Sequence, residues 1–559
     1  MSYQRLALMV TSVLLLLCDP SRLAGQELRG VVRDSATRSV VPGAVVTVLD
    51  ATDIVVGRNI TNQRGEYRIA LPPGARRARV VRLGFRPRIV AIPTTVGGAS
   101  QIDVILTAIP VTPETVRTLA ASNCPRRPDG AAALALLEQA RNGLLATVVS
   151  RSVAPAHMKR LLYDRHMDGN SDRIVRQMVR IDSAVTTGSF GAVRSASDFV
   201  QQDFVQDSAG IRTFFAPDAE TLLDDGFPSG YCFRIMEADR DRPRQIALGF
   251  GVADRRRGRI DIDGALWIDT TARALVDVEF RYVGLDRVYD AFHPGGQVSF
   301  QAMPNGTVLV HRWALRLVGS REDSVTVLMR RMETAQRPVA RYYAQEVGGE
   351  LARAVWDDGS SWKGRLGTLR MRLVDQDSLP AAGTVVNLSD SRYFATADSS
   401  GNIEIPDILP GPYEPFIVDK ELAAVNTTIG TGLKFIAARD SLVQLRYRVP
   451  TAVDFALQLC TLENRPPGSA LILARVTTPD GVPLARARWS VEQFVHVVGW
   501  VYDIKDRPTN EDGEFHYCHM GLGTLVRLTV SYPGAGDAAH VQMLTQHLTI
   551  VPMTLRPKQ

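Results

Sequence analysis

The 559-residue chain lacks the features that define several large classes of protein. After residue 25 it has no run of about 20 apolar residues, the length that a membrane-spanning helix needs. None of its nine histidines is followed by Glu three positions later, and neither a His-Glu-x-x-His nor a Gly-x-Ser-x-Gly motif occurs. These absences argue against a helical membrane protein, a zinc peptidase and a hydrolase with a serine nucleophile turn.

Residues 1–25 predict a secretory signal peptide, because Arg5 precedes an apolar core at 6–17 and small residues follow at 24 and 25. Lipidation of Cys18 is an alternative to cleavage near Gly25. It is disfavoured because a leucine stands before this cysteine, where a small residue is preferred. We therefore expect an exported protein with no transmembrane segment after cleavage.

Four of the five cysteines remain when the one in the signal segment is set aside. An even number in an exported chain favours disulfide bonds, and four cysteines allow three pairings. We expect Cys124 to pair with Cys232 and Cys460 with Cys518, because each bond then stays within one folding unit. The alternative is that all four are buried, unpaired thiols.

A short polar phrase occurs three times in the chain. The copies are Thr61 to Tyr67 (TNQRGEY), Thr396 to Ile403 (TADSSGNI) and Thr509 to Phe515 (TNEDGEF). Each copy contains a polar turn with a Gly, which adopts left-handed backbone conformations at little cost, followed by a pattern that suits an outgoing strand. We interpret the phrase as the mark of one small β module used three times.

The segments around this phrase resemble the carboxypeptidase regulatory-like domain, a transthyretin-like β-sandwich of the carbohydrate-binding-like fold group. In the first copy the resemblance rests on residues 30–33 and 41–48, on the turn, and on the Leu-Pro-Pro-Gly at 71–74. It implies neither catalytic residues nor a cofactor, because the family has none in this domain. The implied sandwiches cover residues 26–110, 363–450 and 460–557.

Residues 111–362 predict a larger antiparallel β domain with one helix. Apolar residues recur at helical spacing over about residues 128–150, after a Pro-Asp-Gly start signal. Residues 260–269 and 274–282 alternate apolar and polar positions, which is typical of an antiparallel meander with one wet face. The predicted fold class is therefore mainly β, with several antiparallel β-sandwich modules flanking this larger domain.

Arginine is concentrated in the first module. Residues 26–110 hold twelve Arg and no Lys against six acids, a balance equal to the +6 of the whole chain. Six of these arginines follow the Pro-Gly turn and form a candidate site for anionic glycans, lipopolysaccharide or lipid phosphates, which guanidinium binds in bidentate fashion. They are Arg76, Arg77, Arg79, Arg82, Arg86 and Arg88. The alternative is a solvated strand face in an arginine-biased chain. Nucleic acid is not an expected partner of an exported protein.

Signals for a metal site are weak, and we predict none. His516, Cys518 and His519 fall within four residues, but on a regular strand the first two would share a face and His519 would point away. Residues 261–264 and 510–513 have the look of calcium loops but lack the downstream Glu, so we interpret both as β turns.

The expected function is non-enzymatic binding or scaffolding in the periplasm, at the outer membrane or at the cell surface, with glycans or envelope proteins as partners. One alternative is an accessory component of a TonB-dependent outer-membrane receptor system. The complete receptor is disfavoured, since its barrel needs many aromatic-flanked strands and aromatic residues make up 7% of this chain. Another alternative is a hydrolase in the central domain. Asp224 and Asp225 could supply paired carboxylates there, although adjacent acids in an Asp-Gly turn usually face water.

Overall fold

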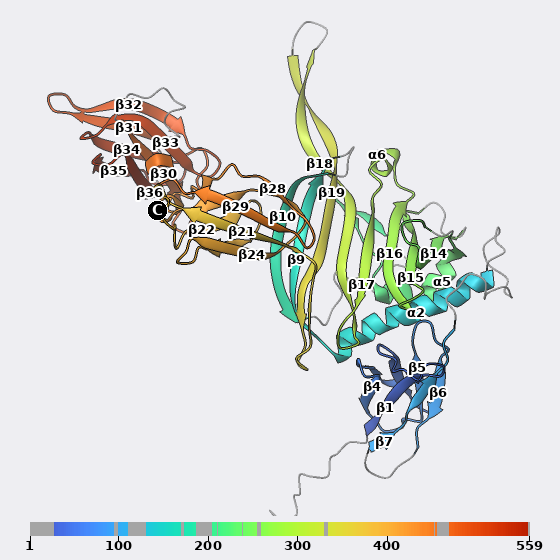
Figure 1. Cartoon of the computed structure of the whole chain (residues 1–559). Helices are drawn as coiled ribbons and strands as arrows, with labels where there is room; N and C mark the ends of the chain where they lie inside the picture. Colours follow the sequence, from blue (N-terminus) through green and yellow to red (C-terminus); the bar gives the residue numbers. More distant parts are fainter. Residues whose placement is uncertain are drawn as a thin grey trace, which may run out of the picture. The chain divides into compact units, whose positions relative to one another are not determined.

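A computed structural model gives the fold of the chain as two compact units. The first runs to Gly364 and the second starts at Arg365, with Gln177–Val179 grouped with the second. Both consist mainly of β-sheets (Figure 1), so the predicted fold class is confirmed. The structure describes residues 27–93, 99–109, 130–168, 173–185, 204–208, 211–236, 239–253, 259–328, 334–451, 453–455 and 469–556.

The first unit begins with a sandwich of two small sheets, drawn in blue in Figure 1. At the centre of one sheet β1 (Glu27–Asp34) runs antiparallel to β4 (Glu66–Ala70) and parallel to β7 (Ala99–Gln101) and β8 (Val104–Leu106). The other sheet has the order β3 (Val55–Ile60), β2 (Val45–Leu49), β5 (Arg77–Val81), β6 (Arg88–Ala91). Apolar residues of both sheets form the sandwich core.

The second unit contains two more sandwiches with the same strand order. In one, β21 (Gly367–Val374) lies between antiparallel β24 (Asn402–Ile408) and parallel β29 (Leu442–Arg448), opposite the sheet β23 (Phe394–Thr396), β22 (Val385–Leu388), β26 (Pro415–Val418), β27 (Ile429–Gly430). In the other, β30 (Ser469–Thr477) lies between β33 (Glu514–Gly521) and β36 (Leu548–Thr554), opposite β32 (Gly499–Pro508), β31 (Arg488–Val495), β34 (Leu525–Ser531), β35 (Ala538–Met543). A shared topology supports the interpretation of one module used three times.

The repeated phrase forms the same turn in all three sandwiches. The side-chain oxygen of the Asx residue that begins the turn accepts hydrogen bonds from the backbone N–H groups two and four residues later. These bonds measure 2.9 and 3.0 Å in the first copy, 2.9 and 2.9 Å in the second, and 3.1 and 2.7 Å in the third. The accepting residues are Asn62, Asp398 and Asn510. The turn therefore depends on an Asx side chain that replaces missing backbone partners.

A glycine ends each turn and touches the central strand of its sheet. Its carbonyl accepts from a backbone N–H of that strand, at 2.8 Å from Val32, 2.7 Å from Leu373 and 2.8 Å from Val476. The three glycines have φ of 68, 75 and 73°, and a Cβ would meet a strand carbonyl oxygen at 2.8, 2.3 and 2.4 Å. They are Gly65, Gly401 and Gly513. Only glycine satisfies both the left-handed backbone and the close approach.

Hydrogen bonds also correct the alignment of the three phrases. Thr61 and Thr509 lie directly before the Asx residue, and the hydroxyl of each donates to a carbonyl of the preceding loop, at 2.7 and 2.8 Å. The equivalent position in the second copy is Ala397, because Asp398 is the turn residue there. Thr396, which we aligned with the other threonines, is one position early. The second copy thus keeps the turn without the buried hydroxyl.

The larger part of the first unit is a ten-stranded sheet. Neighbouring strands from β9 to β13 all run antiparallel, as the meander pattern predicted. Its order is β10 (Ile174–Val185), β9 (His157–Met167), β19 (Thr334–Val355), β18 (Val308–Leu328), β17 (Gly295–Ala302), β16 (Ala274–Val283), β15 (Asp261–Asp269), β14 (Gln245–Val252), β13 (Tyr231–Ile235), with β20 (Ser361–Lys363) beside β19.

Short elements complete the described chain. They are β11 (Val205–Ser208), β12 (Ile211–Phe214), α4 (Ala219–Leu223), α5 (Gly226–Gly230), α6 (Arg287–Asp290), β25 (Gly411–Tyr413), α7 (Lys420–Ala423) and β28 (Phe435–Ala437). No helix in the described part of the chain is both long enough and apolar enough to span a membrane.

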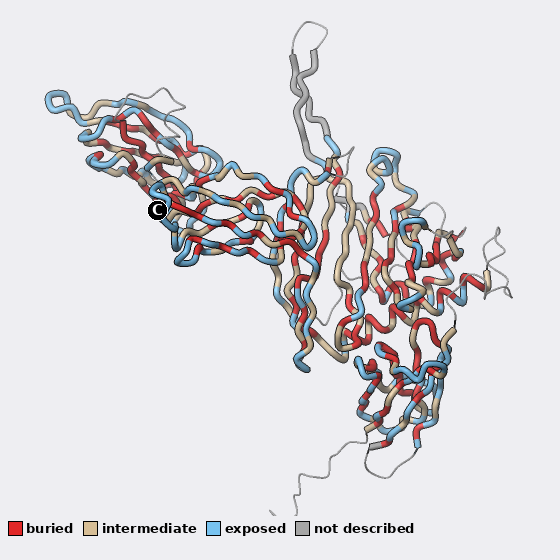
Figure 2. Tube along the Cα trace, in the orientation of Figure 1, coloured by how far each residue is buried: buried red, intermediate tan, exposed pale blue. Residues whose placement is uncertain are grey.

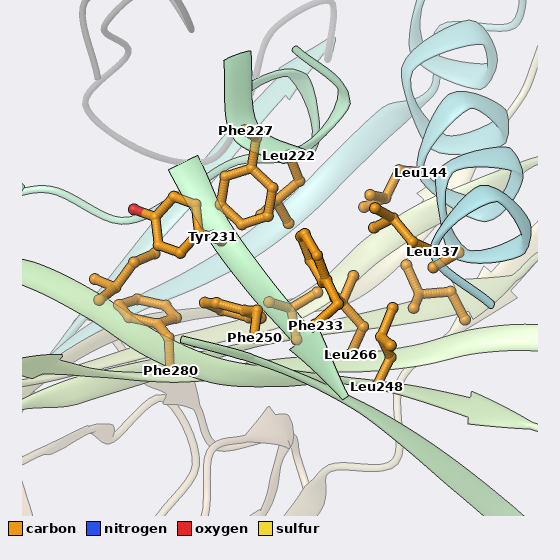
Figure 3. Packing of buried hydrophobic residues seen from close by; sticks show 14 of the residues in the cluster. Leu137, Leu144, Leu222, Phe227, Tyr231, Phe233, Leu248, Phe250, Leu266 and Phe280 are labelled. Atoms are coloured by element: carbon orange, nitrogen blue, oxygen red, sulfur yellow. The ribbon is translucent and has the colours of Figure 1, made fainter. Parts of the chain in front are cut away.

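The predicted helix is confirmed as α2 (Gly130–Val153), and it is buried on two sides. Leu137 and Leu144 point toward Phe233 and Leu266 of the large sheet and belong to its core (Figure 3). Ala146 and Val149 instead pack against β2, β3 and β5 of the first sandwich. The helix therefore lies between the sandwich and the sheet, which explains why its apolar residues do not form one narrow stripe.

A turn of the first sandwich penetrates the core of the large sheet. Leu83 is fully buried in the core cluster that also contains residues of α2. Its Cδ1 approaches the helix so closely that a Cβ added to Gly143 would lie 3.2 Å from it. The N–H of Gly84 donates to Gln139 Oε1 at 2.8 Å. These contacts, with the two-sided packing of α2, join the sandwich and the sheet within one compact unit.

Replacing the glycine of the third turn tests the close approach. We expect Gly513→Ala to lower the free energy of unfolding by about 3 kcal/mol, since it combines left-handed strain with a Cβ–carbonyl overlap. Gly534→Ala is the matched control, because its φ is +81° but a Cβ there meets nothing within 4 Å; its cost should be about 1 kcal/mol. Denaturant unfolding with hydrogen exchange on β30 and β33 measures both. Equal costs would contradict the role of the contact.

Candidate binding face on the first module

The sheet β3-β2-β5-β6 has an inner and an outer face. Val46 and Val48 of β2 point into the sandwich core. The residues that alternate with these two valines along β2 point to the outer face. Their neighbours on β3 and β5 are fixed by the register of the strands. The row Ile60–Val45–Val81 is covered by α2. The rows farther from α2 are candidates for binding.

The next outward row carries two arginines on either side of a threonine. Arg58 of β3 and Arg79 of β5 both oppose Thr47 of β2, and Ile89 of β6 opposes Arg79. Both arginines are exposed, and neither guanidinium bonds to any residue that the structure describes. We call these four residues the arginine row. Arg58 was missed in the sequence because it lies outside the dense arginine run; the register of the β2–β3 hairpin places it there.

The other arginines of the predicted site do not join this row. Arg77 lies one row beyond and forms an ion pair with Asp53 at 2.7 Å. Arg76 and Arg86 are exposed outside the strands of this face, and Arg88 opposes Val80, whose side chain points into the core. The six arginines that lie close together in sequence thus do not form a single patch.

Arg82 is bound within the protein. Its guanidinium donates to the carbonyl oxygens of Pro42 at 3.0 Å and of Arg273 at 2.8 Å. Burial lowers the pKa of Arg82 to about 10, with a smaller contribution from the neighbouring Arg273, so the group is still cationic at neutral pH. Arg273 in turn lies over the ring of Phe85 at 4.9 Å and 3.7 Å from Asp34. Arg82 therefore connects the first sandwich to the large sheet and does not belong to a ligand site.

The candidate disulfides fall partly outside the described residues, where Cys124 and Cys460 lie. No disulfide links two described residues, although Cys232 and Cys518 are each disulfide-bonded. The pairing therefore stays a prediction.

A β-bulge corrects the expected arrangement of His516, Cys518 and His519. The register of β33 shifts between the partners of Ala470 and Ile472, so that two residues of β33 face one residue of β30. Both histidines are exposed and Cys518 is fully buried, so His516 and Cys518 do not share a face. Within the described ranges no three His, Cys, Asp or Glu side chains come together as metal ligands.

Of the two segments interpreted as β turns, one is a turn and the other is not. Asn510 forms the repeated Asx turn. Residues 261–264 instead begin strand β15. The Asp261 carboxylate is fully buried and accepts from the Tyr231 hydroxyl and from the N–H of Ile262 at 2.9 Å. Both of these donors bond to Oδ1, so one of the two oxygens that a cation would need is already used.

Carboxylate pairs in the central domain are engaged by neighbouring donors. Asp224 accepts from the N–H of Gly226 at 2.8 Å, and Asp225 pairs with Arg141 at 2.8 Å. These contacts stabilise the junction between helices α4 and α5.

A second pair, Asp277 and Glu279, lies on the sheet face opposite the α2 core. Arg242 forms ion pairs with both, and Trp267 Nε1 donates to Glu279 at 3.0 Å. Ser299 donates to Asp277 at 2.6 Å. Carboxylates held by this many donors are poor candidates for a general acid and base, which weighs against the hydrolase alternative.

Comparison with known families identifies the first sandwich. The sequence profile of the carboxypeptidase regulatory-like domain matches residues 27–107. Residues 27–107 are a carboxypeptidase regulatory-like domain. The arginine row thus lies on one outer face of a regulatory-like domain, next to the face that α2 covers. No curated protein matches the chain.

Solved structures of two pilins and of one further bacterial protein show a weak similarity to parts of the chain. The Bacillus anthracis TIE protein is 9% identical with a TM-score of 0.14, covering 63% of this chain and 64% of its own length. The Streptococcal ancillary pilin is 11% identical with a TM-score of 0.15, covering 47% and 81%. A variant of BcpA, the major pilin subunit of Bacillus cereus, is 9% identical with a TM-score of 0.13, covering 76% and 99%. TM-scores this low establish neither a shared fold nor a function.

Removing the guanidinium of Arg82 tests its role in the join. We expect Arg82→Ala to lower the unfolding free energy of the first unit by about 2 kcal/mol, because two charge-assisted hydrogen bonds to carbonyls are lost. Hydrogen exchange on α2 should accelerate as well. Arg86→Ala, an exposed arginine of the same domain, should leave both unchanged. If the two variants behave alike, Arg82 does not hold the sandwich to the sheet.

Peptide mapping of the full chain under non-reducing conditions tests the disulfide pairing. The expected products are one peptide pair joining Cys124 to Cys232 and another joining Cys460 to Cys518. A peptide that joins Cys232 to Cys460 would show that the bonds do not stay within one folding unit.

Proposed function

We propose that this is an exported, non-enzymatic protein of the cell envelope that binds anionic glycans through the arginine row of its regulatory-like domain. The observation that supports the proposal is the pair Arg58 and Arg79 on either side of Thr47, two exposed guanidinium groups that bond to no residue in the described part of the chain. Guanidinium is suited to bidentate contacts with phosphate and carboxylate groups.

The strand spacing sets the expected spacing of the anions. Arg58 and Arg79 lie on strands separated by one intervening strand, β2. Two inter-strand steps correspond to about 10 Å between their Cα atoms. Such a pair suits a ligand that carries two or more anionic groups along its length, as acidic polysaccharides and lipopolysaccharide do. Ile89, 56% exposed, adds an apolar surface at the end of the row.

The support beneath the row favours recognition by a rigid surface. Thr47 is buried at 7% exposure between the two arginines, and the strands on which all three stand pack on α2 through the adjacent row. A rigid platform loses little conformational entropy when a ligand binds. The two further sandwiches of the second unit share the topology, and we assign them a spacing or scaffolding role in the periplasm, at the outer membrane or at the cell surface.

Binding of the mature full-length chain to immobilised lipopolysaccharide tests this function. We expect Arg58→Ala with Arg79→Ala to weaken binding at least ten-fold and to reduce its salt dependence, because two charge contacts are lost. Arg86→Ala with Arg88→Ala is the matched control. It removes the same charge from exposed positions outside the row.

Dephosphorylated lipopolysaccharide separates charge recognition from sugar recognition. Wild-type binding that falls on dephosphorylation supports the row as an anion site. Equal losses in the two double variants would mean that net charge, not the row, attracts the ligand. Absence of wild-type binding to any acidic glycan would overturn the proposal.

A further inference from the structure

The hairpin between β31 and β32 ends in an apolar loop. Its residues are Val495, His496, Val497 and Val498, followed by Gly499. Val497 is 94% exposed and Val498 71% exposed. Exposed hairpin loops are normally built from Gly, Asn, Asp and Ser, whose side chains suit both the turn and water. Valines at this position therefore need an explanation other than turn formation.

The turn geometry does not supply that explanation. The N–H of Val498 donates to the carbonyl of Val495 at 3.0 Å, and Gly499 follows with φ +87°. This is a three-residue hairpin loop closed by a glycine in the left-handed region. The backbone conformation is set by the glycine and the turn bond, and neither contact involves a valine side chain. Polar residues would form the same loop.

Aromatic rings lie directly below the loop on the stem of the hairpin. Phe494 and Trp500 oppose each other across the two strands, with ring centroids 5.4 Å apart in an edge-to-face arrangement. Tyr502 stands two residues farther along β32 and is 50% exposed. These rings form a layer between the valine tip and the rest of the sandwich.

Cations stand against these rings. The Arg527 guanidinium lies 4.6 Å from the Trp500 ring centroid, and the Lys505 ammonium lies 4.9 Å from that of Tyr502. Glu492, 3% exposed, accepts two bonds from Arg527, at 2.5 and 2.7 Å. The stem is thus joined to the neighbouring strand β34 by an ion pair and ring contacts.

The tip differs from the other exposed apolar residues in the described chain, most of which occur singly, as is normal for protein surfaces. Here Phe494, Val495, Val497, Val498 and Tyr502 are all exposed within nine residues. Figure 2 shows the end of this hairpin as an exposed loop that protrudes from its sandwich.

We propose that the valine tip inserts into the interface of a lipid bilayer. The order along the hairpin is apolar tip, aromatic layer and the Lys505 ammonium, which matches the order of acyl chains, interface and headgroup phosphates in a bilayer. A loop one hairpin wide is convex and cannot by itself bury the roughly 800 Å² per partner of a standard protein interface. A bilayer accepts such a tip because it closes around it.

Vesicle sedimentation with the mature full-length chain tests this proposal. The probes are vesicles of phosphatidylethanolamine with phosphatidylglycerol at three to one, and vesicles of phosphatidylcholine alone. We expect Val497→Ser with Val498→Ser to lower the partition coefficient at least ten-fold for both kinds of vesicle. The reason is that the double variant no longer gains the free energy of moving two valine side chains from water into the bilayer. Neither side chain belongs to the buried core, so the melting temperature should not change.

Val482→Ser is the matched control, since this valine is 57% exposed in another loop of the same sandwich. It should bind vesicles as the wild type does. Arg58→Ala with Arg79→Ala should also retain vesicle binding, which separates this surface from the glycan site.

Brominated lipids provide a second measurement. Quenching of tryptophan fluorescence by vesicles brominated near the headgroup should occur in the wild type and fall strongly in Trp500→Phe. The proposal is overturned if the wild type does not bind vesicles, or if the double valine variant binds them unchanged. It is also overturned if analytical ultracentrifugation shows that the valine tip instead joins two copies of the chain.

Discussion

All three sandwiches depend on one backbone contact, between the glycine of the polar turn and the central strand of its sheet. The glycine carbonyl accepts from Val32 of β1, Leu373 of β21 or Val476 of β30. Each of these strands is the central one of its sheet in the described part of the chain. The turn therefore holds the central strand, to which the other strands of that sheet are hydrogen-bonded. An Asx side chain holds the turn, while the threonine hydroxyl is dispensable, since Ala397 replaces it in one copy.

Helix α2 has a corresponding role at the next level of organisation. One side completes the core of the large sheet and the other covers the outer face of the first sandwich. Leu83 and Arg82 reinforce this join from the sandwich side. The remaining outer rows of the same face are consequently left at the surface. The arginine row is thus exposed because α2 covers the adjacent row, Ile60–Val45–Val81, and not the arginine row itself.

The sequence predicted those features that depend on local patterns. The turn glycines, the helix at α2 and the alternation in β15 and β16 all follow from spacing along the chain. Features set by pairing between distant strands were not predictable in the same way. Arg58 joins Arg79 only through the register of β2, and the bulge in β33 reverses the expected side of Cys518. Arg82 belongs to a dense arginine run, but its contact with Arg273 needs the tertiary structure.

The two-sided burial of α2 also constrains the order in which parts of the chain can be covered during synthesis. The first sandwich is synthesised before the helix that covers it, and the helix precedes Leu275 and Val308, which pack beside it. Val45 and Val81 therefore face water until Ala146 and Val149 of the helix have been made, and Val308 joins this cluster later still. During that interval the domain carries an unprotected apolar face, and a holding chaperone would bind there.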